Sequence, residues 1–169
     1  ILQAYDSTVI KADVEFGGID QKFNCLVGRE MQTMMGQPSQ QILLSPLLIG
    51  TDGTQKMSKS LGNYIGIAEP PGEIYGKVMS IPDGLIMDYL KLVTDVSEEE
   101  LERFQHQIET QSVNPMMLKK RLAREIVAQF HDVDAAKQAE TEFERVFQRR
   151  GIPEEGPECS ISFNTIEYI

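Results

Sequence analysis

The sequence contains too few cysteines and histidines to build a disulfide framework or a metal centre. Its 169 residues include two cysteines, Cys25 and Cys159, and two histidines, His106 and His131. The cysteines lack the spacing of a disulfide-rich domain or a zinc site, and the histidines fall in helical stretches without ligand spacing. We therefore predict no metal held by protein ligands, no catalytic histidine, and a small, buried Cys25.

Long apolar runs and a secretory signal are also missing. No stretch approaches the roughly 20 apolar residues that a membrane-spanning helix needs, and no signal-peptide pattern is present. The hydrophobic share of 41% and the charged share of 25% are ordinary for a globular protein. We therefore predict no membrane partner.

The net charge of −10 lacks the positive excess that is typical of nucleic-acid-binding proteins. The sum hides a local cluster of basic residues in one predicted helix, formed by Lys119, Lys120, Arg121 and Arg124. A basic face on an acidic protein can still hold a phosphate backbone, with strong salt dependence. The alternative is an ordinary solvated helix face.

Residues 1–68 combine strand and helix patterns. Val14–Phe16 is a short strand candidate that runs into two glycines, and Asp20 is placed to cap the following helix. Apolar residues recur in that helix at intervals of three and four: Phe23, Leu26, Val27, Met31 and Met34. Ile42–Ile49 reads as a buried strand that ends near Pro46. We expect half of an α/β unit, with ligands at the ends of its strands.

From residue 69 to residue 150 the pattern is helical. Gly72–Ser80 predicts one short helix, and Pro82 opens another that runs to about Thr94. Ser97 begins a capping box, and Asn114 precedes a proline at a first helical position. That helix carries one apolar face, formed by Leu118, Leu122, Ile126 and Phe130. Asp132 or Asp134 caps a last helix, which ends at Arg149-Arg150. Together these segments predict a small helical bundle.

The segment GTDGTQKMSKSLGN, from Gly50 to Asn63, is the most informative in the chain. Lys56 and Lys59 lie three apart in a loop rich in glycine, threonine and serine. A lysine ammonium suits a phosphate as a point charge, and two on one loop can neutralise charge that develops on a leaving polyphosphate. Two surface lysines on a solvated turn would give the same short K-x-x-K pattern.

Two further sets of polar residues have the pattern of a ligand site. Gly17-Gly18-Ile19-Asp20-Gln21 occupies a strand-to-helix turn, where glycine lets the backbone approach a ligand and Asp20 can accept hydrogen bonds from ribose hydroxyls. Gln3 and Asp6 lie three apart and share a helix face. A glycine turn with a helix cap, and an exposed helix end, are the structural alternatives.

The lysine loop resembles the second signature of class I aminoacyl-tRNA synthetases. The opening ILQAYD, the segment ADVEFGGIDQKFNCLVGREMQ from Ala12 to Gln32, and KVMSIPDGLIMDYLKLVT from Lys77 to Thr94 resemble bacterial-type tyrosyl-tRNA synthetases. The resemblance runs from Ile1 to about Pro157. It implies a fold that is α/β and then all-α: the second half of a Rossmann-like class I synthetase catalytic domain, followed by a small helical bundle.

The resemblance also implies roles for individual residues at the nucleotide. Gly18 and Asp20 would hold the adenylate ribose, and the backbone of Ile49 would contact adenine. Lys56 and Lys59 would stabilise the pyrophosphate as it leaves ATP, which binds with Mg²⁺. Ser60 would complete the catalytic group.

Tyrosine would be bound by a second set of residues. By the same resemblance, Gln3 would reach the α-amino group, Asp6 would accept a hydrogen bond from the phenol hydroxyl, and Gln21 would face the carboxylate. The tyrosine that precedes this glutamine in the family would fall before Ile1, and Ile19 replaces a more usual Thr or Ser. Any polar role at position 19 is therefore not expected.

The resemblance divides the chain into three parts: the C-terminal part of the catalytic domain with the lysine loop (1–68), a helical anticodon-binding-type domain (69–150), and a linker or tail (151–169). Lys119, Lys120, Arg121 and Arg124 would contact tRNA(Tyr). The first class I signature, of the H-x-G-H type, is absent. We therefore expect a fragment that is inactive alone, cut from a parent that is homodimeric.

Other assignments remain open. Tryptophanyl-tRNA synthetase shares the fold and similar motifs, and the Gln3–Asp6 element argues for tyrosine instead. A non-catalytic RNA-binding relative is a different class of alternative, against which the intact Lys56, Lys59, Asp20 and Gln21 argue. The expected location is the bacterial cytoplasm, with an organelle as the alternative.

Overall fold

The computed structural model describes residues 1–148 and divides into two compact units, Ile1–Tyr64 and Ile65–Ile169. The first unit ends at Tyr64, near residue 68, after which the sequence predicts a boundary. Whether the units correspond to domains of a longer protein stays a prediction. The proposed linker, 151–169, and the predicted helix end at Arg149-Arg150 lie outside the described residues.

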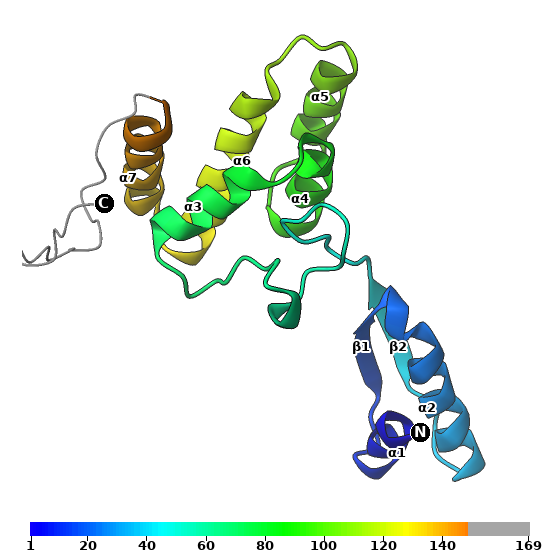
Figure 1. The fold of residues 1–169 in the computed structure, drawn as a ribbon. Coiled ribbons are helices and arrows are strands. Elements are labelled where there is room, and N and C mark those ends of the chain that lie inside the picture. Colours follow the sequence, from blue (N-terminus) through cyan, green and yellow to red (C-terminus); the bar gives the residue numbers. More distant parts are fainter. Residues whose placement is uncertain (149–169) are drawn as a thin grey trace, which may run out of the picture. The chain divides into compact units, whose positions relative to one another are not determined.

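The first unit is a β–α–β arrangement preceded by a helix (Figure 1). Its elements are α1 (Leu2–Val9), β1 (Val14–Gly18), a 3₁₀ turn (Ile19–Gln21), α2 (Lys22–Met34) and β2 (Gln41–Ser45). The two strands pair in parallel, from Val14 opposite Gln41 to Gly18 opposite Ser45. Helix α2 forms the crossover that a parallel pair requires, and it packs against α1 and both strands. The carboxyl ends of both strands therefore meet at one edge.

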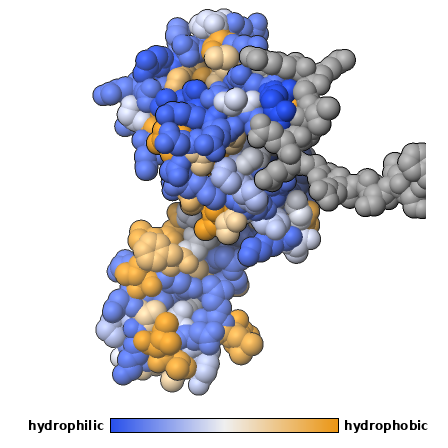
Figure 2. Space-filling view, turned by 90° about the vertical axis from the view of Figure 1, so that its left-hand side faces the viewer, coloured by the Kyte–Doolittle hydropathy of each residue, from blue (hydrophilic) through white to orange (hydrophobic). Residues whose placement is uncertain are grey.

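The interior of the first unit is small and partly polar. Ala4 and Cys25 are its buried apolar residues, and Ser7, Thr8 and Gln32 are buried beside them. The apolar repeat predicted in α2 is there, but much of it faces outward, since Phe23 is 75% exposed. Figure 2 shows hydrophobic areas on the surface of this unit. Its exposed large apolar residues include Leu2, Tyr5, Val9, Phe16, Phe23, Met34 and Leu43.

Two details of the first unit differ from the sequence predictions. The strand before Pro46 ends where expected, at Ser45, but it alternates between exposed and half-buried residues and is not a buried strand. Asp20 does not cap α2: the N-cap is Gln21, without a side-chain cap bond, and the Asp20 carboxylate contacts Lys56. A capping rule considers only nearby residues, so it does not predict the contact of Asp20 with the distant Lys56.

All regular secondary structure in the described part of the second unit is helical (Figure 1). It contains α3 (Pro71–Ser80), a 3₁₀ turn (Asp83–Leu85), α4 (Ile86–Val93), α5 (Glu98–Glu109), α6 (Pro115–Phe130), α7 (Val133–Phe143) and a π turn (Glu144–Gln148). Helix α6 packs against α3, α4 and α7. Its predicted apolar face is buried at Leu118, Leu122 and Ile126, whereas Phe130 is 42% exposed.

Side chains cap three of these helices. The Ser97 hydroxyl accepts from the Glu100 backbone N–H at the start of α5 (3.4 Å), and Asn114 Oδ1 accepts from the Met116 N–H at the start of α6 (3.0 Å). Asp132, and not Asp134, caps α7 by accepting from the Ala135 N–H (2.7 Å). These bonds satisfy backbone donors that a helix leaves free in its first turn.

Candidate active site

A tight glycine turn leads from β1 into α2. A Cβ atom added at Gly18 would lie 2.6 Å from Asp20 Oδ1 and 2.9 Å from Leu47 Cδ2, so only glycine fits without displacing its neighbours. The turn brings Asp20 and Gln21 to the carboxyl end of β1. In open α/β sheets this edge is where ligands bind.

The lysine loop reaches this turn through an ion pair. Lys56 Nζ lies 2.7 Å from Asp20 Oδ2, with the two side chains 55% and 29% exposed. The hydrogen bond from Lys56 is the main cause that lowers the pKa of the Asp20 carboxyl below its ordinary value. Two residues predicted to bind the same nucleotide, 36 positions apart, are therefore in direct contact.

The backbone of the loop is folded against the segment that precedes it. Ile49 and Lys56 form an isolated antiparallel bridge, and the Met57 N–H donates to the Leu48 carbonyl (2.8 Å). Lys59 then opens an exposed 3₁₀ turn, Lys59–Leu61. The Ser60 hydroxyl lies 2.9 Å from the Ser58 hydroxyl. Ile49, Lys56, Lys59 and Ser60 are thus all carried by one folded loop.

The residues predicted to bind tyrosine occupy α1 and the glycine turn. Gln3 is half-buried, and its amide nitrogen donates to Glu15 Oε1 at 2.8 Å. Asp6 is exposed on α1, and Gln21 Oε1 accepts from Asn24 Nδ2 at 2.8 Å. The structure brings none of these three side chains into a hydrogen bond with another of them, and their ligand roles stay predictions.

Glu15, in the middle of β1, was missed by the sequence reasoning. Besides Gln3, its carboxylate accepts from Ser7 Oγ (3.3 Å) and from the amide of Gln40. Burial opposes its ionisation, but hydrogen bonds from Gln3, Gln40, Cys25 and Ser7 prevail and hold its pKa below the ordinary value. A charged residue inside the otherwise apolar strand VEFGG was the available signal.

The predicted tRNA-binding cations are all engaged in ion pairs. Lys119 lies 2.6 Å from Asp83, Arg124 3.2 Å from Glu140, and Arg121 2.8 Å from Glu125. Lys120 is buried and pairs with Glu144. The side chains of Arg121 and Arg124 are about 40% exposed, whereas those of Lys119 and Lys120 are 14% and 11% exposed. Contact with tRNA stays a prediction, for which the two arginines are the accessible members.

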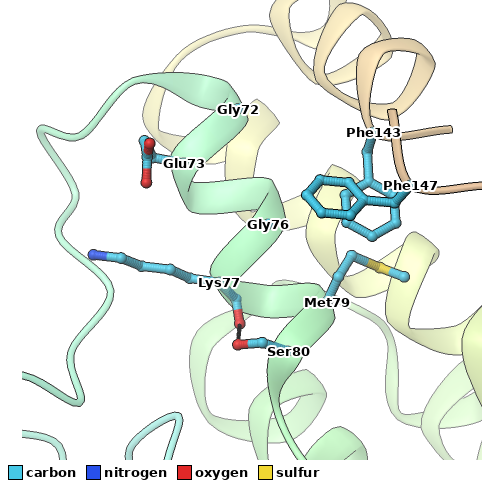
Figure 3. A pocket seen from close by; sticks show the side chains of 8 residues that line it. All are labelled: Gly72, Glu73, Gly76, Lys77, Met79, Ser80, Phe143 and Phe147. Atoms are coloured by element: carbon cyan, nitrogen blue, oxygen red, sulfur yellow. Dashed lines mark hydrogen bonds between the residues drawn. The ribbon is translucent and has the colours of Figure 1, made fainter. Parts of the chain in front are cut away.

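The second unit also has an open pocket of about 520 Å³ between α3 and the end of the described chain (Figure 3). Its lining combines glycines with apolar and polar side chains: Gly72, Glu73, Gly76, Lys77, Met79, Ser80, Phe143 and Phe147. Lys77 is paired with Glu69 at 2.5 Å. None of the predicted site residues lines this pocket, and its groups do not form an acid–base or nucleophilic set, so we do not take it as the active site.

The described residues, 1–148, contain no helix that is both long and apolar enough to cross a bilayer.

Comparison with known proteins defines the class to which this fold and site belong. Residues 1–148 match the family model of class I tRNA synthetases (W and Y). The chain therefore belongs to the class I tRNA synthetases of the tryptophan and tyrosine type.

Individual relatives are more specific. The chain is 60% identical over 161 residues to the tyrosine–tRNA ligase of Dehalococcoides mccartyi strain CBDB1, covering 95% of this chain and 41% of that protein. It is 50% identical over 167 residues to the tyrosine–tRNA ligase of Carboxydothermus hydrogenoformans, covering 99% of this chain and 41% of that protein. The chain thus spans well under half the length of these relatives.

A solved structure agrees in fold. The tyrosyl-tRNA synthetase of Archaeoglobus fulgidus, crystallised with L-tyrosine, has a TM-score of 0.64 and 26% identity, covering 82% of this chain and 50% of that one. The family resemblance predicted from the motifs is confirmed. The assignment of the two units to particular domains of a synthetase stays a prediction.

Proposed function

We propose that this chain is part of a tyrosine–tRNA ligase, comprising the C-terminal part of its catalytic domain and a helical anticodon-binding domain. The observation that carries the proposal is the contact of Lys56 with Asp20 at the glycine turn. It joins the lysine loop to a carboxylate suited to ribose, in a chain that is 60% identical to a relative of that name.

The first reaction of the complete ligase joins tyrosine to the AMP part of ATP, which arrives with Mg²⁺. The tyrosine carboxylate attacks the α-phosphorus, tyrosyl-adenylate forms, and pyrophosphate leaves. In this scheme Gly18 and Asp20 hold the ribose, and the Ile49 backbone contacts adenine. Lys56 and Lys59, with Ser60, stabilise the negative charge that grows on the pyrophosphate. Electrostatic stabilisation of this kind typically contributes about 3–4 kcal/mol per group.

ATP would change the partner of Lys56. In the structure this ammonium is paired with Asp20, and both groups are exposed enough to exchange partners in water. A polyphosphate offers Lys56 more negative charge than one carboxylate does, and ribose hydroxyls can donate to the Asp20 carboxylate that is then released. The ion pair therefore holds the two groups close to where the nucleotide would use them.

Specificity for tyrosine would come from α1 and the turn. Gln3 contacts the α-amino group, Gln21 faces the carboxylate, and Asp6 accepts a hydrogen bond from the phenol hydroxyl. A site built to pair a substrate hydroxyl rejects an analogue that lacks it, because the buried partner is left unsatisfied; tyrosyl-tRNA synthetases are themselves the established example, against phenylalanine.

Transfer of the tyrosyl group requires tRNA(Tyr), which the helical unit would contact through its basic residues. Arg121 and Arg124 are accessible for phosphate contact, whereas Lys119 and Lys120 would first have to leave Asp83 and Glu144. Such contacts release counterions and weaken steeply with added salt.

Within the complete ligase, the rest of the catalytic domain would cover the exposed apolar surface of the first unit, since parallel sheets are normally covered on both faces. The parent protein is proposed to be a homodimer in the bacterial cytoplasm. The present chain alone is expected to be inactive, because it contains no H-x-G-H signature.

A tryptophan-specific enzyme is the second candidate, since the matching family model covers both amino acids. The test is ATP–pyrophosphate exchange by the complete protein with tyrosine, tryptophan or phenylalanine, in the wild type and in Asp6→Asn. Exchange with tyrosine only, and its loss in Asp6→Asn, is the expected result. Exchange with tryptophan would move the protein to the sister specificity, and no exchange with any amino acid would favour a non-catalytic RNA-binding protein.

A further inference from the structure

Asn63, the last residue of the lysine loop, is a polar side chain that is only 4% exposed. Its amide nitrogen donates to Asp52 Oδ2 (2.6 Å) and to the Lys56 carbonyl (3.2 Å), and its amide oxygen accepts from the Ser58 N–H (2.8 Å). A buried polar group that satisfies both ends of its amide is costly to replace, because each lost partner leaves a desolvated group behind.

Asp52 holds the other half of the loop. Its Oδ1 accepts from the backbone N–H groups of Thr54 (2.8 Å) and Gln55 (2.9 Å), while its Oδ2 receives the Asn63 amide. The Gln55 and Thr54 N–H groups, followed by Asn63, lower the pKa of this carboxyl below its ordinary value. The two side chains together therefore tie the backbone from residue 54 to residue 58.

Gly50 is the third part of this arrangement. A Cβ atom there would lie 2.3 Å from Asn63 Nδ2 and 2.6 Å from the Asn63 carbonyl, so glycine is the residue that allows the close approach. The backbone is closed by two further bonds, from the Thr51 N–H to the Asn63 carbonyl (2.9 Å) and from the Gly50 N–H to the Gln55 carbonyl (2.8 Å).

The bonds of Asn63 hold the backbone between the two lysines. They hold the carbonyl of Lys56 itself and the N–H of Ser58, the residue directly before Lys59. The side chains of Lys56 and Lys59 remain exposed, so the constraint acts on their backbone and leaves the ammonium groups accessible.

We propose that Asn63 and Asp52 form a clamp that positions Lys56 and Lys59 for the departing pyrophosphate. Neither residue would touch the substrate; both are positioning residues. The existence of the clamp depends only on the contacts above, whereas its role in catalysis rests on the proposed function. If the lysines act in the transition state, loosening their loop lowers kcat more than it weakens tyrosine binding.

The test uses the complete ligase and the variants Asn63→Ala, Asn63→Asp, Asp52→Asn and the double variant Asp52→Asn/Asn63→Asp. Asn63→Asp places a carboxylate opposite the Asp52 carboxylate. The double variant restores one donor and one acceptor, with the donor at position 52 and the acceptor at position 63. Gln55→Ala is the matched control, because that side chain is exposed in the same loop and only its backbone makes the bonds described here. Circular dichroism checks that each variant is folded.

The first readout is hydrogen exchange at the amides of Thr54, Gln55 and Ser58, which requires no activity. We expect Asn63→Ala and Asn63→Asp to speed their exchange by about tenfold or more, as expected when an opening equilibrium loses roughly one hydrogen bond. The double variant should recover part of the protection, and Gln55→Ala should not alter it. Unchanged exchange in Asn63→Ala would overturn the clamp.

The second readout is tyrosine-dependent ATP–pyrophosphate exchange. Asn63→Ala is expected to lower kcat by about 10- to 100-fold, with KM for tyrosine within about twofold, and the double variant should exceed Asn63→Asp in kcat. The positioning role would be overturned if KM for tyrosine rose by the same factor as kcat fell, or if kcat did not fall. If the wild type shows no tyrosine-dependent exchange, the proposed function fails, and hydrogen exchange still decides whether the clamp exists.

Discussion

Replacing Lys120 by methionine should destabilise the helical unit, because this lysine is buried in an ion pair. Lys120 is 9% exposed as a residue and its ammonium contacts Glu144. Methionine retains most of the apolar stem that packs inside the unit. The substitution therefore removes the charge while it preserves much of the packing.

The expected cost follows from the exposure of the partner. Removing one member of a fully buried ion pair typically costs about 3–5 kcal/mol, since the other charge is left without compensation. The Glu144 side chain is 33% exposed, so water can solvate part of its carboxylate. We therefore expect a smaller loss, about 1–3 kcal/mol in the free energy of unfolding.

The assay is urea unfolding of the purified chain, followed by circular dichroism. Lys137→Met is the matched control: its partner is Asp134, the two side chains are 67% and 83% exposed, and such surface pairs contribute about 0–1 kcal/mol. The double variant Lys120→Met/Glu144→Gln should recover part of the loss. Equal effects of Lys120→Met and Lys137→Met would refute the reasoning.

Two further predictions concern the interior of the first unit. Hydrogen bonds lower the pKa of Glu15 in the fold below its ordinary value of 4.5. Its ionised form therefore contributes stability above pH 4.5 that is lost as the pH falls toward the folded-state pKa. Unfolding midpoints measured from pH 6 to pH 3 should fall more in the wild type than in Glu15→Gln, and parallel curves would contradict this. Burial, and then the charge of Glu15, raise the pKa of the Cys25 thiol, so iodoacetamide should label Cys25 slowly at pH 8 until denaturant is added; fast labelling in the folded chain, located by mass spectrometry, would be inconsistent with its burial.

Local sequence signals predicted much of the secondary structure. Ser97, Asn114 and Asp132 cap helices as expected, because the donors that they satisfy lie within three residues along the chain. Pro46 directly follows β2, where a missing backbone donor excludes a longer ladder. These features depend on residues that are close together in the sequence, so local patterns predict them.

Long-range contacts were not predictable in the same way. Asp20 pairs with Lys56 instead of capping α2. In α6, Lys119 and Lys120 are matched by acids from other segments, Asp83 and Glu144. The Glu15 cluster joins α1, β1, α2 and the residue before β2 through side chains as much as 25 positions apart. Periodicity and composition identify which residues are polar, but not which distant partner each of them meets.

The burial of the first unit was predicted incorrectly for a related reason. The apolar run before Pro46 has the composition of a buried strand, and Leu43 is nevertheless 54% exposed. Burial requires a covering element as well as an apolar side chain, and the chain spans 41% of the length of its tyrosine–tRNA ligase relatives. Strand composition alone therefore does not predict whether a strand is buried.

The most direct test of the account is tyrosine-dependent ATP–pyrophosphate exchange by the complete protein in the wild type, Lys56→Ala, Lys59→Ala and Lys137→Ala. The account predicts exchange with tyrosine, a loss of about 10²–10³-fold in kcat for each loop lysine, and no loss for Lys137→Ala, which removes an exposed surface pair in the other unit. Wild-type rates in Lys56→Ala and Lys59→Ala would contradict the central claim that this loop stabilises the departing pyrophosphate.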